Sequence, residues 1–287
     1  MTDFTKEALV STAWLAEHLS DPDLRVIDGT YYLPHEGLDA RAEFELHHIP
    51  GAVFFDIDDI ADSNSDLPHM LPEPHKFSSR VRKLGLGDGL RFVVYDQRGL
   101  FSAPRVWWTF RYFGHHDVAV LDGGLPKWLN EERPVEDGPA HAGERHFTAR
   151  MDSLTLRDKD QMLANIGSGR EQVLDARSAG RFAGTDPEPR DGLRGGHMPG
   201  SLNLPYPDLM DRETQTLLPV DAMKARFEAA GLDMSRPVVT TCGSGITAAI
   251  LALGLFRVGH KDVALYDGSW SEWGLPGDTP VETGPAR

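Results

Sequence analysis

The sequence contains one pattern twice, in the same order, and this internal repeat restricts the possible folds more than any other feature. The segment His48-Ile49-Pro50-Gly51-Ala52 recurs as His197-Met198-Pro199-Gly200-Ser201, and Val118 to Gly123 recurs as Val263 to Gly268. Because order and spacing are both kept, two copies of one domain explain the matches better than chance does. We therefore predict three segments, which are an N-terminal domain over 1–132, a linker rich in Pro, Gly and His over 133–152, and a C-terminal domain over 153–287.

Each copy alternates short β-branched runs with stretches of helical period. The runs predict strands at 25–28, 92–96, 118–121, 173–175, 238–241 and 263–266, and the periodic stretches predict helices at 12–19, 75–84, 105–113, 221–230 and 247–258. Strands that alternate with helices form a parallel sheet with helices on both faces, so the predicted fold class is α/β. Ligands of such sheets bind at the carboxyl ends of the strands.

The charge balance restricts the partners. The chain has 29 Lys and Arg against 44 Asp and Glu, a formal net charge of −15, which disfavours nucleic acid and anionic membranes. The longest apolar stretch, Ala248 to Phe256, is shorter than the roughly 20 residues of a membrane-spanning helix, and the first residues lack the pattern of a signal or transit peptide. The single cysteine, Cys242, excludes an internal disulfide and suits a reducing compartment, so we expect a cytoplasmic protein.

No metal site is expected. The pairs His47-His48 and His115-His116 are adjacent residues, whose side chains point to opposite faces of a strand, and no further ligand motif accompanies them. The acidic segment Phe54 to Asp59 lacks the glycine and the terminal glutamate of a calcium loop. We expect solvated loops at all three places.

Cys242 lies at the carboxyl end of a predicted strand, before a glycine-bearing turn that leads into a helix. Gly243 and Gly245 allow the backbone to curl so that successive N–H groups face the sulfur, and the helix adds the positive end of its dipole. We expect this arrangement to stabilise a thiolate and to lower the thiol pKa below the free value of about 8.5. The first copy has Asp96 or Gln97 at this place, so only the second copy carries the thiol.

The cysteine also has two other interpretations. A lone free cysteine is more often a small buried hydrophobe, although glycines at a strand-to-helix turn favour a reactive thiol. A phosphatase loop needs an arginine six positions after the nucleophile to hold the phosphoryl oxygens, and that position is Ala248. The sequence therefore disfavours phosphate-ester chemistry.

The loop Cys242-Gly243-Ser244-Gly245-Ile246-Thr247 resembles the active loop of the tandem-domain rhodanese family, and within it the 3-mercaptopyruvate sulfurtransferase type, with Ile246 where valine is more usual. Thiosulfate-specific relatives carry an arginine and a lysine just after the cysteine, where this chain has Gly243 and Ser244. Other segments that match the family are Asp39-Ala40-Arg41, His48 to Ala52, Ser102 to Trp108, Gly180-Arg181-Phe182 and Glu188-Pro189-Arg190. The resemblance covers about Ser11 to about Pro280 and implies two rhodanese-like α/β domains, of which the C-terminal one is catalytic.

The resemblance implies a sulfurtransferase that moves sulfur from 3-mercaptopyruvate through a Cys242 persulfide to a thiol such as thioredoxin, or to cyanide, and releases pyruvate. It implies no metal and no organic cofactor. It assigns Ser244, His48 and Asp39 to catalysis beside Cys242. It assigns substrate binding to six residues, which are Arg181, Arg190, Gly243, Gly245, Ile246 and Thr247.

Alternatives stay open for the function and for single residues. A thiosulfate:cyanide sulfurtransferase and a non-catalytic rhodanese-like binding module share the family's fold. Arg181 and Arg190 have acidic neighbours with which they would form ordinary ion pairs, and Ser244 is also suited to cap the following helix. His48 recurs as His197, so both copies have this histidine although only one has the cysteine, which indicates a structural role in the turn.

Overall fold

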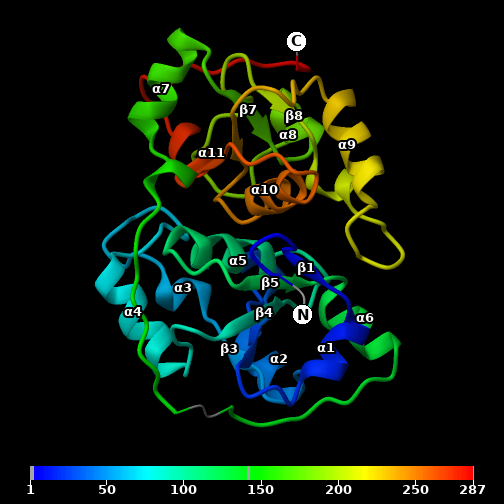
Figure 1. The fold of residues 1–287 in the computed structure, drawn as a ribbon. Coiled ribbons are helices and arrows are strands. Elements are labelled where there is room, and N and C mark those ends of the chain that lie inside the picture. The colour runs from blue at the N-terminus through cyan, green and yellow to red at the C-terminus, as the bar shows by residue number, and fades with distance from the viewer. Residues whose placement is uncertain (1–2, 141–142, 287) are drawn as a thin grey trace. The chain divides into compact units, whose positions relative to one another are not determined.

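Two five-stranded parallel sheets with the same strand order form the framework of the chain (Figure 1). The computed structural model describes residues 3–140 and 143–286. It divides into unit 1, which comprises Met1–Ser63, Leu71–Asp152 and Arg212–Leu217, and unit 2, which comprises Asn64–Met70, Ser153–Asp211 and Leu218–Arg287. The strand orders are β1-β5-β4-β2-β3 and β6-β10-β9-β7-β8, so every strand of one sheet has a counterpart in the other. The duplicated α/β fold predicted from the repeat is confirmed.

Unit 1 has helices on both faces of its sheet (Figure 1). Its elements are β1 (Leu9–Val10), α1 (Thr12–His18), β2 (Leu24–Asp28), α2 (Ala40–Leu46), β3 (Val53–Phe54), α3 (Ile57–Ile60), α4 (Pro74–Lys83), β4 (Arg91–Tyr95), α5 (Ala103–Tyr112), β5 (Val118–Leu121) and α6 (Gly124–Asn130). Leu15, Phe44 and Trp128 bring α1, α2 and α6 into one apolar core with Val93 of β4. Alternate residues of a strand point to opposite faces, and Phe92 accordingly packs against Phe110 of α5 on the other face.

Unit 2 repeats this arrangement. Its elements are β6 (Leu156–Arg157), α7 (Lys159–Ser168), β7 (Gln172–Asp175), α8 (Ala179–Ala183), β8 (Leu202–Asn203), α9 (Val220–Ala229), β9 (Val238–Thr241), α10 (Ala248–Arg257), β10 (Val263–Tyr266) and α11 (Ser269–Trp273). Met162 of α7 and Trp270 of α11 share a buried core with Val239 of β9. The strands of this sheet are parallel, so their carboxyl ends lie along one edge.

The predicted strands and helices are confirmed, with ends that differ by at most two residues from those of the structure. The sequence patterns did not indicate the edge strands of two residues, the short helices α2, α3, α6, α8 and α11, or the ten-residue helix α7. An element of two residues has no period, and a helix of one or two turns shows too few residues for a clear period. The patterns therefore predicted the central strands of both sheets and the helices α1, α4, α5, α9 and α10.

The expectation of solvated loops is wrong for part of each of the three places. Phe54 and Phe55 are buried, because Phe54 packs against Phe44 of α2 and Phe55 packs against Phe110 of α5. Asp56 accepts the N–H groups of Asp58 and Asp59 at the start of α3. His48 is also buried. His115 packs on Phe92, and burial lowers its pKa to about 4. In the described residues no cluster of His, Cys, Asp or Glu is suited to hold a metal ion.

Part of the proposed linker packs against unit 1. The N–H of Asp88 donates to the carbonyl of His146 at 2.8 Å, and the N–H of Arg150 donates to the carbonyl of Phe113 at 2.9 Å. Phe147, between them, is buried. The boundaries at 133 and 153 remain our proposal.

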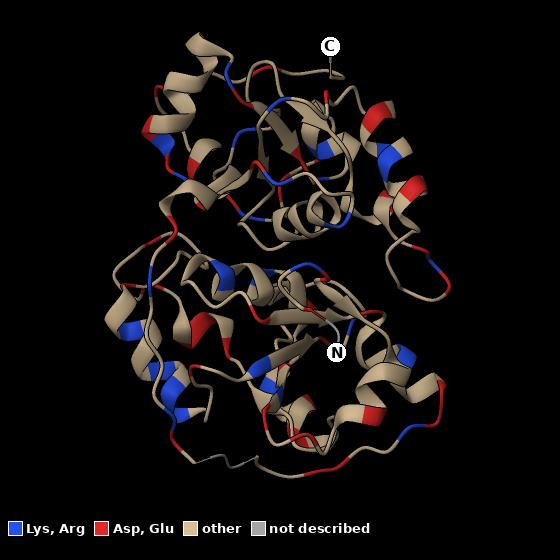
Figure 2. Ribbon diagram, in the orientation of Figure 1, with Lys and Arg blue, Asp and Glu red and all other residues tan. Residues whose placement is uncertain are grey.

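Charged residues are spread over both units, as Figure 2 shows. Arg80, Arg82 and Lys83 lie in the last turn of α4, where they complement the helix dipole. None of the helices in the described part of the chain is long and apolar enough to cross a membrane.

Candidate active site

Cys242 begins the connection from β9 to α10 at the carboxyl edge of the sheet in unit 2. It directly follows Thr241, the last residue of β9, which lies beside Asp175 at the end of β7. Gly245 has a φ of +81°, a left-handed conformation that favours glycine and lets the chain turn into α10. The cysteine is 2% exposed, and Ser244 is 6% exposed. The predicted loop therefore forms a tight turn around a buried thiol.

The start of α11 holds this loop from one side. The N–H of Trp270 donates to the Cys242 carbonyl at 2.9 Å, and the N–H and hydroxyl of Ser271 donate to the Gly243 carbonyl at 2.8 and 2.7 Å. The N–H of Cys242 donates to the hydroxyl of Ser269 at 3.4 Å. These contacts escaped the sequence analysis, which placed no functional residue in this segment, because main-chain contacts leave little trace in the sequence.

The loop offers hydrogen-bond donors that are not used. Within the described part of the chain, the N–H groups of Gly243, Ser244, Ile246 and Thr247 donate to no oxygen or nitrogen acceptor. The Ser244 hydroxyl makes no hydrogen bond there either, so it does not cap α10. Ser244 and Ile246 are buried, and the N–H groups of buried residues seldom lack an acceptor. Their presence at the start of a ten-residue helix suits the binding of an anion.

Unit 1 contains the same loop with its anion built in. Asp28 pairs with Tyr95 as Asp175 pairs with Thr241, so the strand register makes Asp96, and not Gln97, the counterpart of Cys242. The N–H groups that donate to the Asp96 carboxylate, each at 2.8 Å, are those of Arg98, Phe101, Ser102 and Ala103.

The donors of the two loops correspond when they are counted from the first residue of each helix. Ala103 begins α5 and Ala248 begins α10, so Phe101 and Ser102 correspond to Ile246 and Thr247. The first two donate to a carboxylate, and the second two have no acceptor in the described chain. The repeat thus has one loop whose N–H groups hold a carboxylate of the chain and one loop whose corresponding N–H groups have no acceptor among the described residues.

Arg181, on α8, lies beside the cysteine loop. Its Nε and Nη2 donate to Glu188 Oε2 at 3.2 and 2.6 Å. A Cβ atom built on Gly243 would lie 3.0 Å from Arg181 Nη2, so the guanidinium borders the loop at this residue. The structure brings together Arg181 and the loop, and it also forms the ion pair that was the alternative interpretation.

Arg190 differs from Arg181. Its side chain is half-buried and makes no hydrogen bond or ion pair with the residues that the structure describes. The ion pair with a neighbouring acid that was the alternative for this residue is not formed. A role of Arg190 in substrate binding stays a prediction.

Asp39 and His48 belong to unit 1. Asp39 caps α2, since its carboxylate accepts the N–H groups of Arg41 and Ala42 at 2.9 and 3.2 Å. His48 stacks on Phe44, its Nδ1 donates to the Phe44 carbonyl at 2.8 Å, and its Nε2 lies 3.4 Å from a Glu136 carboxylate oxygen.

His197 has the same surroundings in unit 2, where it stacks on Phe182 and donates from Nδ1 to the Phe182 carbonyl at 2.9 Å. Its Nε2 lies 3.9 Å from Oε2 of Glu282. The two histidines thus occupy equivalent turns. A part of His48 and Asp39 in proton transfer stays a prediction.

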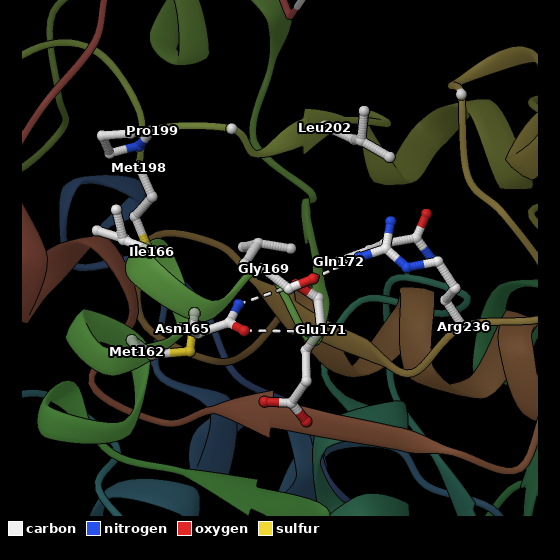
Figure 3. A pocket seen from close by; sticks show the side chains of 13 residues that line it. Met162, Asn165, Ile166, Gly169, Glu171, Gln172, Met198, Pro199, Leu202 and Arg236 are labelled. Carbon is white, nitrogen blue, oxygen red and sulfur yellow. Dashed lines mark hydrogen bonds between the residues drawn. The ribbon is translucent and has the colours of Figure 1, made fainter.

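A cavity of about 270 Å³ lies in unit 2 near the amino end of β7, away from the carboxyl ends of the strands (Figure 3). Its apolar lining includes Met162 and Met198. The Asn165 side chain is bound on both sides to the backbone of Glu171, and Arg236 donates to the Gly169 carbonyl at 2.5 Å. We assign no part of the reaction to this cavity.

The fold and the site define a duplicated α/β protein with one cysteine loop. A family model described as a rhodanese-like domain matches residues 11–131 and 158–275. The chain belongs to the rhodanese family.

Relatives with two different names are similar to this chain over most of its length. The 3-mercaptopyruvate sulfurtransferase of Mus musculus is 47% identical over 272 residues, which cover 93% of this chain and 91% of that protein. The thiosulfate sulfurtransferase of Cricetulus griseus is 42% identical over 286 residues and 96% of each chain. The crystal structure of SseA from Escherichia coli, described with the 3-mercaptopyruvate sulfotransferases, matches 93% of this chain and 100% of its own with a TM-score of 0.85 and 38% identity.

Proposed function

We propose that the chain is a sulfurtransferase that takes sulfur from 3-mercaptopyruvate onto Cys242 and passes it to a thiol or to cyanide. The observation that carries the proposal is the set of unused N–H donors in the loop that follows the cysteine. The filled counterpart in unit 1, where the same donors hold a carboxylate, supports an anionic occupant. A persulfide sulfur next to Cys242 is such an occupant.

In the first half-reaction the Cys242 thiolate attacks the sulfur of 3-mercaptopyruvate. The new S–S bond forms as the C–S bond breaks, and the bonding pair leaves with the carbon as the enolate of pyruvate, which then takes up a proton. The Ser244 hydroxyl, which has no partner in the described chain, is suited to donate to the carbonyl oxygen as the enolate charge develops. Arg181 and Arg190 would bind the substrate carboxylate.

In the second half-reaction a thiolate acceptor attacks the outer sulfur, and Cys242 leaves as a thiolate ready for another cycle. Cyanide would accept the same sulfur as thiocyanate. Atoms and electrons balance in both half-reactions without a metal or an organic cofactor. Reduced thioredoxin is the acceptor that we propose, in a cytoplasmic setting that suits a chain with one free thiol.

Thiosulfate is the competing donor, because a relative with that name is similar over nearly the whole chain. Thiosulfate is a dianion and profits from cations beside the nucleophile. The two residues after Cys242 are Gly243 and Ser244, which carry no charge. A monoanion with a ketone suits this loop better.

The test is mass spectrometry of the intact protein after exposure to 3-mercaptopyruvate or to thiosulfate. We expect one added sulfur atom on Cys242 from 3-mercaptopyruvate, pyruvate in equal amount, and neither product from Cys242→Ser. Faster loading by thiosulfate would overturn the choice of donor. A cysteine that takes sulfur from neither donor would leave the non-catalytic binding module as the better interpretation.

A further inference from the structure

Glu188 is a buried carboxylate that two arginines share. Its side chain is 2% exposed. Oε1 accepts from Arg177 Nη1 at 2.7 Å, and Oε2 accepts from Arg181 Nη2 at 2.6 Å and from Arg181 Nε at 3.2 Å. Each oxygen therefore serves one guanidinium, and the carboxylate fixes the distance between the two arginines.

The Arg181 side of this contact reaches the cysteine loop directly. The guanidinium uses Nε and Nη2 on Glu188, and Nη2 is the atom that borders Gly243. Arg181 is 23% exposed at its side chain, so it would turn toward water without this partner. The carboxylate holds the long Arg181 side chain in one rotamer. Without it, substrate binding would have to order this side chain, at a cost in conformational entropy.

The Arg177 side reaches the loop through α11. Arg177 has a fully buried side chain, donates to Asp175 from Nη2 at 2.6 Å, and stacks on the ring of Trp270 at 4.0 Å. The N–H of Trp270 in turn holds the carbonyl of Cys242 at 2.9 Å. Glu188 is thus connected to both sides of the nucleophile, through Arg181 to Gly243 and through Arg177 and Trp270 to Cys242.

We propose that Glu188 is a positioning residue for sulfur transfer, which aligns Arg181 with the Cys242 loop so that the substrate carboxylate meets a guanidinium that is already in place. The proposal rests on the function proposed above. Its second contact, through Arg177, supports the loop itself. Glu188 touches neither the reacting sulfur nor, in this proposal, the substrate.

A charge argument alone leads to the opposite expectation. The charges of Asp175, Arg177, Arg181 and Glu188 cancel, and removal of the Glu188 charge would leave a net positive cluster beside the loop. A positive cluster attracts an anionic donor more strongly, so KM would fall. If Glu188 instead positions Arg181, its neutral replacement raises KM. The sign of the change in KM separates the two.

The test is Glu188→Gln, assayed with 3-mercaptopyruvate and a thiol acceptor. The amide has one oxygen, and we expect it to stay with Arg177, because a fully buried guanidinium cannot find water whereas Arg181 can. We expect KM to rise about tenfold and kcat to stay within about twofold. The loss of one charged hydrogen bond to Arg181 has a free energy that corresponds to about this change in KM.

Glu171→Gln is the matched control. Glu171 accepts from Nε and Nη2 of Arg157 at 3.0 to 3.1 and 2.6 Å, a pair of the same kind in unit 2, but near the amino end of β7. We expect it to leave KM and kcat within about twofold of the wild type. Thermal unfolding of both variants completes this comparison. If Glu188→Gln and Glu171→Gln lose similar stability but only Glu188→Gln changes KM, the change in KM comes from positioning and not from a general loss of stability.

Arg181→Ala and the double variant Arg181→Ala with Glu188→Gln complete the test. If Glu188 acts through Arg181, the second substitution adds little to the first. A fall in KM for Glu188→Gln, an unchanged KM, or fully additive effects would each overturn the inference. Wild-type protein that forms no persulfide from 3-mercaptopyruvate would instead overturn the proposed function, so the two failures are distinguishable.

Discussion

Replacing Asp96 with alanine tests whether the loop before the helix requires an anion in this fold. The N–H groups of Arg98, Phe101, Ser102 and Ala103 donate to this fully buried carboxylate, each at 2.8 Å. Alanine removes the acceptor of all these donors and provides none. The substitution thus turns the loop of unit 1 into the unfilled state that the Cys242 loop has in unit 2.

We expect the free energy of unfolding of unit 1 to fall by about 4 kcal/mol. A buried donor without a partner costs about 1–3 kcal/mol, so the orphaned donors set an upper limit well above this value. Water in the vacated space satisfies some of them. Burial raises the pKa of Asp96 despite its backbone hydrogen bonds, so the removal of the carboxylate also relieves a desolvation cost. Both effects lower the loss.

Asp96→Asn is the matched comparison. The amide keeps one oxygen for the N–H groups of Phe101, Ser102 and Ala103 and loses the acceptor of Arg98, so we expect a loss of about 1 kcal/mol. Urea unfolding gives the stabilities, and hydrogen exchange at the amides of Phe101, Ser102 and Ala103 reports whether the effect lies in this loop.

Sulfate gives the experiment a second readout. An anion that enters the vacated loop stabilises Asp96→Ala by RT ln(1 + [L]/Kd), beyond the general effect of sulfate that the wild type also shows. Refutation would be a urea midpoint of Asp96→Ala equal to that of the wild type, with the same slope. The loop amides would then contribute nothing to anion binding, and the comparison with Cys242 would lose its basis.

Two further predictions follow from single contacts. Gly243→Ala places a Cβ 3.0 Å from Arg181 Nη2, which must shift, so we expect a severalfold higher KM for 3-mercaptopyruvate; an unchanged KM would show that this position of Arg181 is not used. Asp28 accepts from the hydroxyl and the N–H of Thr30, where Asp175 accepts from the Arg177 guanidinium, and burial raises the pKa of Asp28 from 3.8 to about 6. Since the folded state binds this proton more tightly than the unfolded state, wild-type stability falls by at most about 3 kcal/mol as the pH rises from about 4 to about 6, and Asp28→Asn lacks this loss. Urea unfolding of both proteins at the two pH values gives this change. An equal change in the free energy of unfolding of the wild type and of Asp28→Asn would contradict the prediction.

The sequence predicted the fold well because its repeat and its long elements are contiguous patterns. The strands around the nucleophile, including Val238–Thr241, are buried runs with a clear length and a clear end. The edge strand Leu202–Asn203 has two residues, and only its pairing with β7 defines it. Such an element depends on a neighbour that the local sequence does not reveal.

Part of the candidate site could be predicted from the sequence, and part could not. The loop from Cys242 to Thr247 is contiguous, so residue types and spacing alone predicted its turn and its place at the sheet edge. The choice between Asp96 and Gln97 needed the strand register. Glu188 belongs to a segment that matches the family, but the sequence assigned it no role, because its importance lies in which two guanidinium groups it joins.

The two loops differ in how they satisfy the N–H groups at the start of the following helix. Helix starts leave N–H groups that need acceptors, and a buried donor without one destabilises the folded state. Unit 1 meets that need with Asp96, a carboxylate of the folded chain itself. Ile246 and Thr247 of unit 2 have no acceptor among the described residues, so we expect their loop to gain stability when an anion binds there. Because the thiol stands where the carboxylate stands in unit 1, we expect a negatively charged sulfur attached to Cys242 to gain most from those donors.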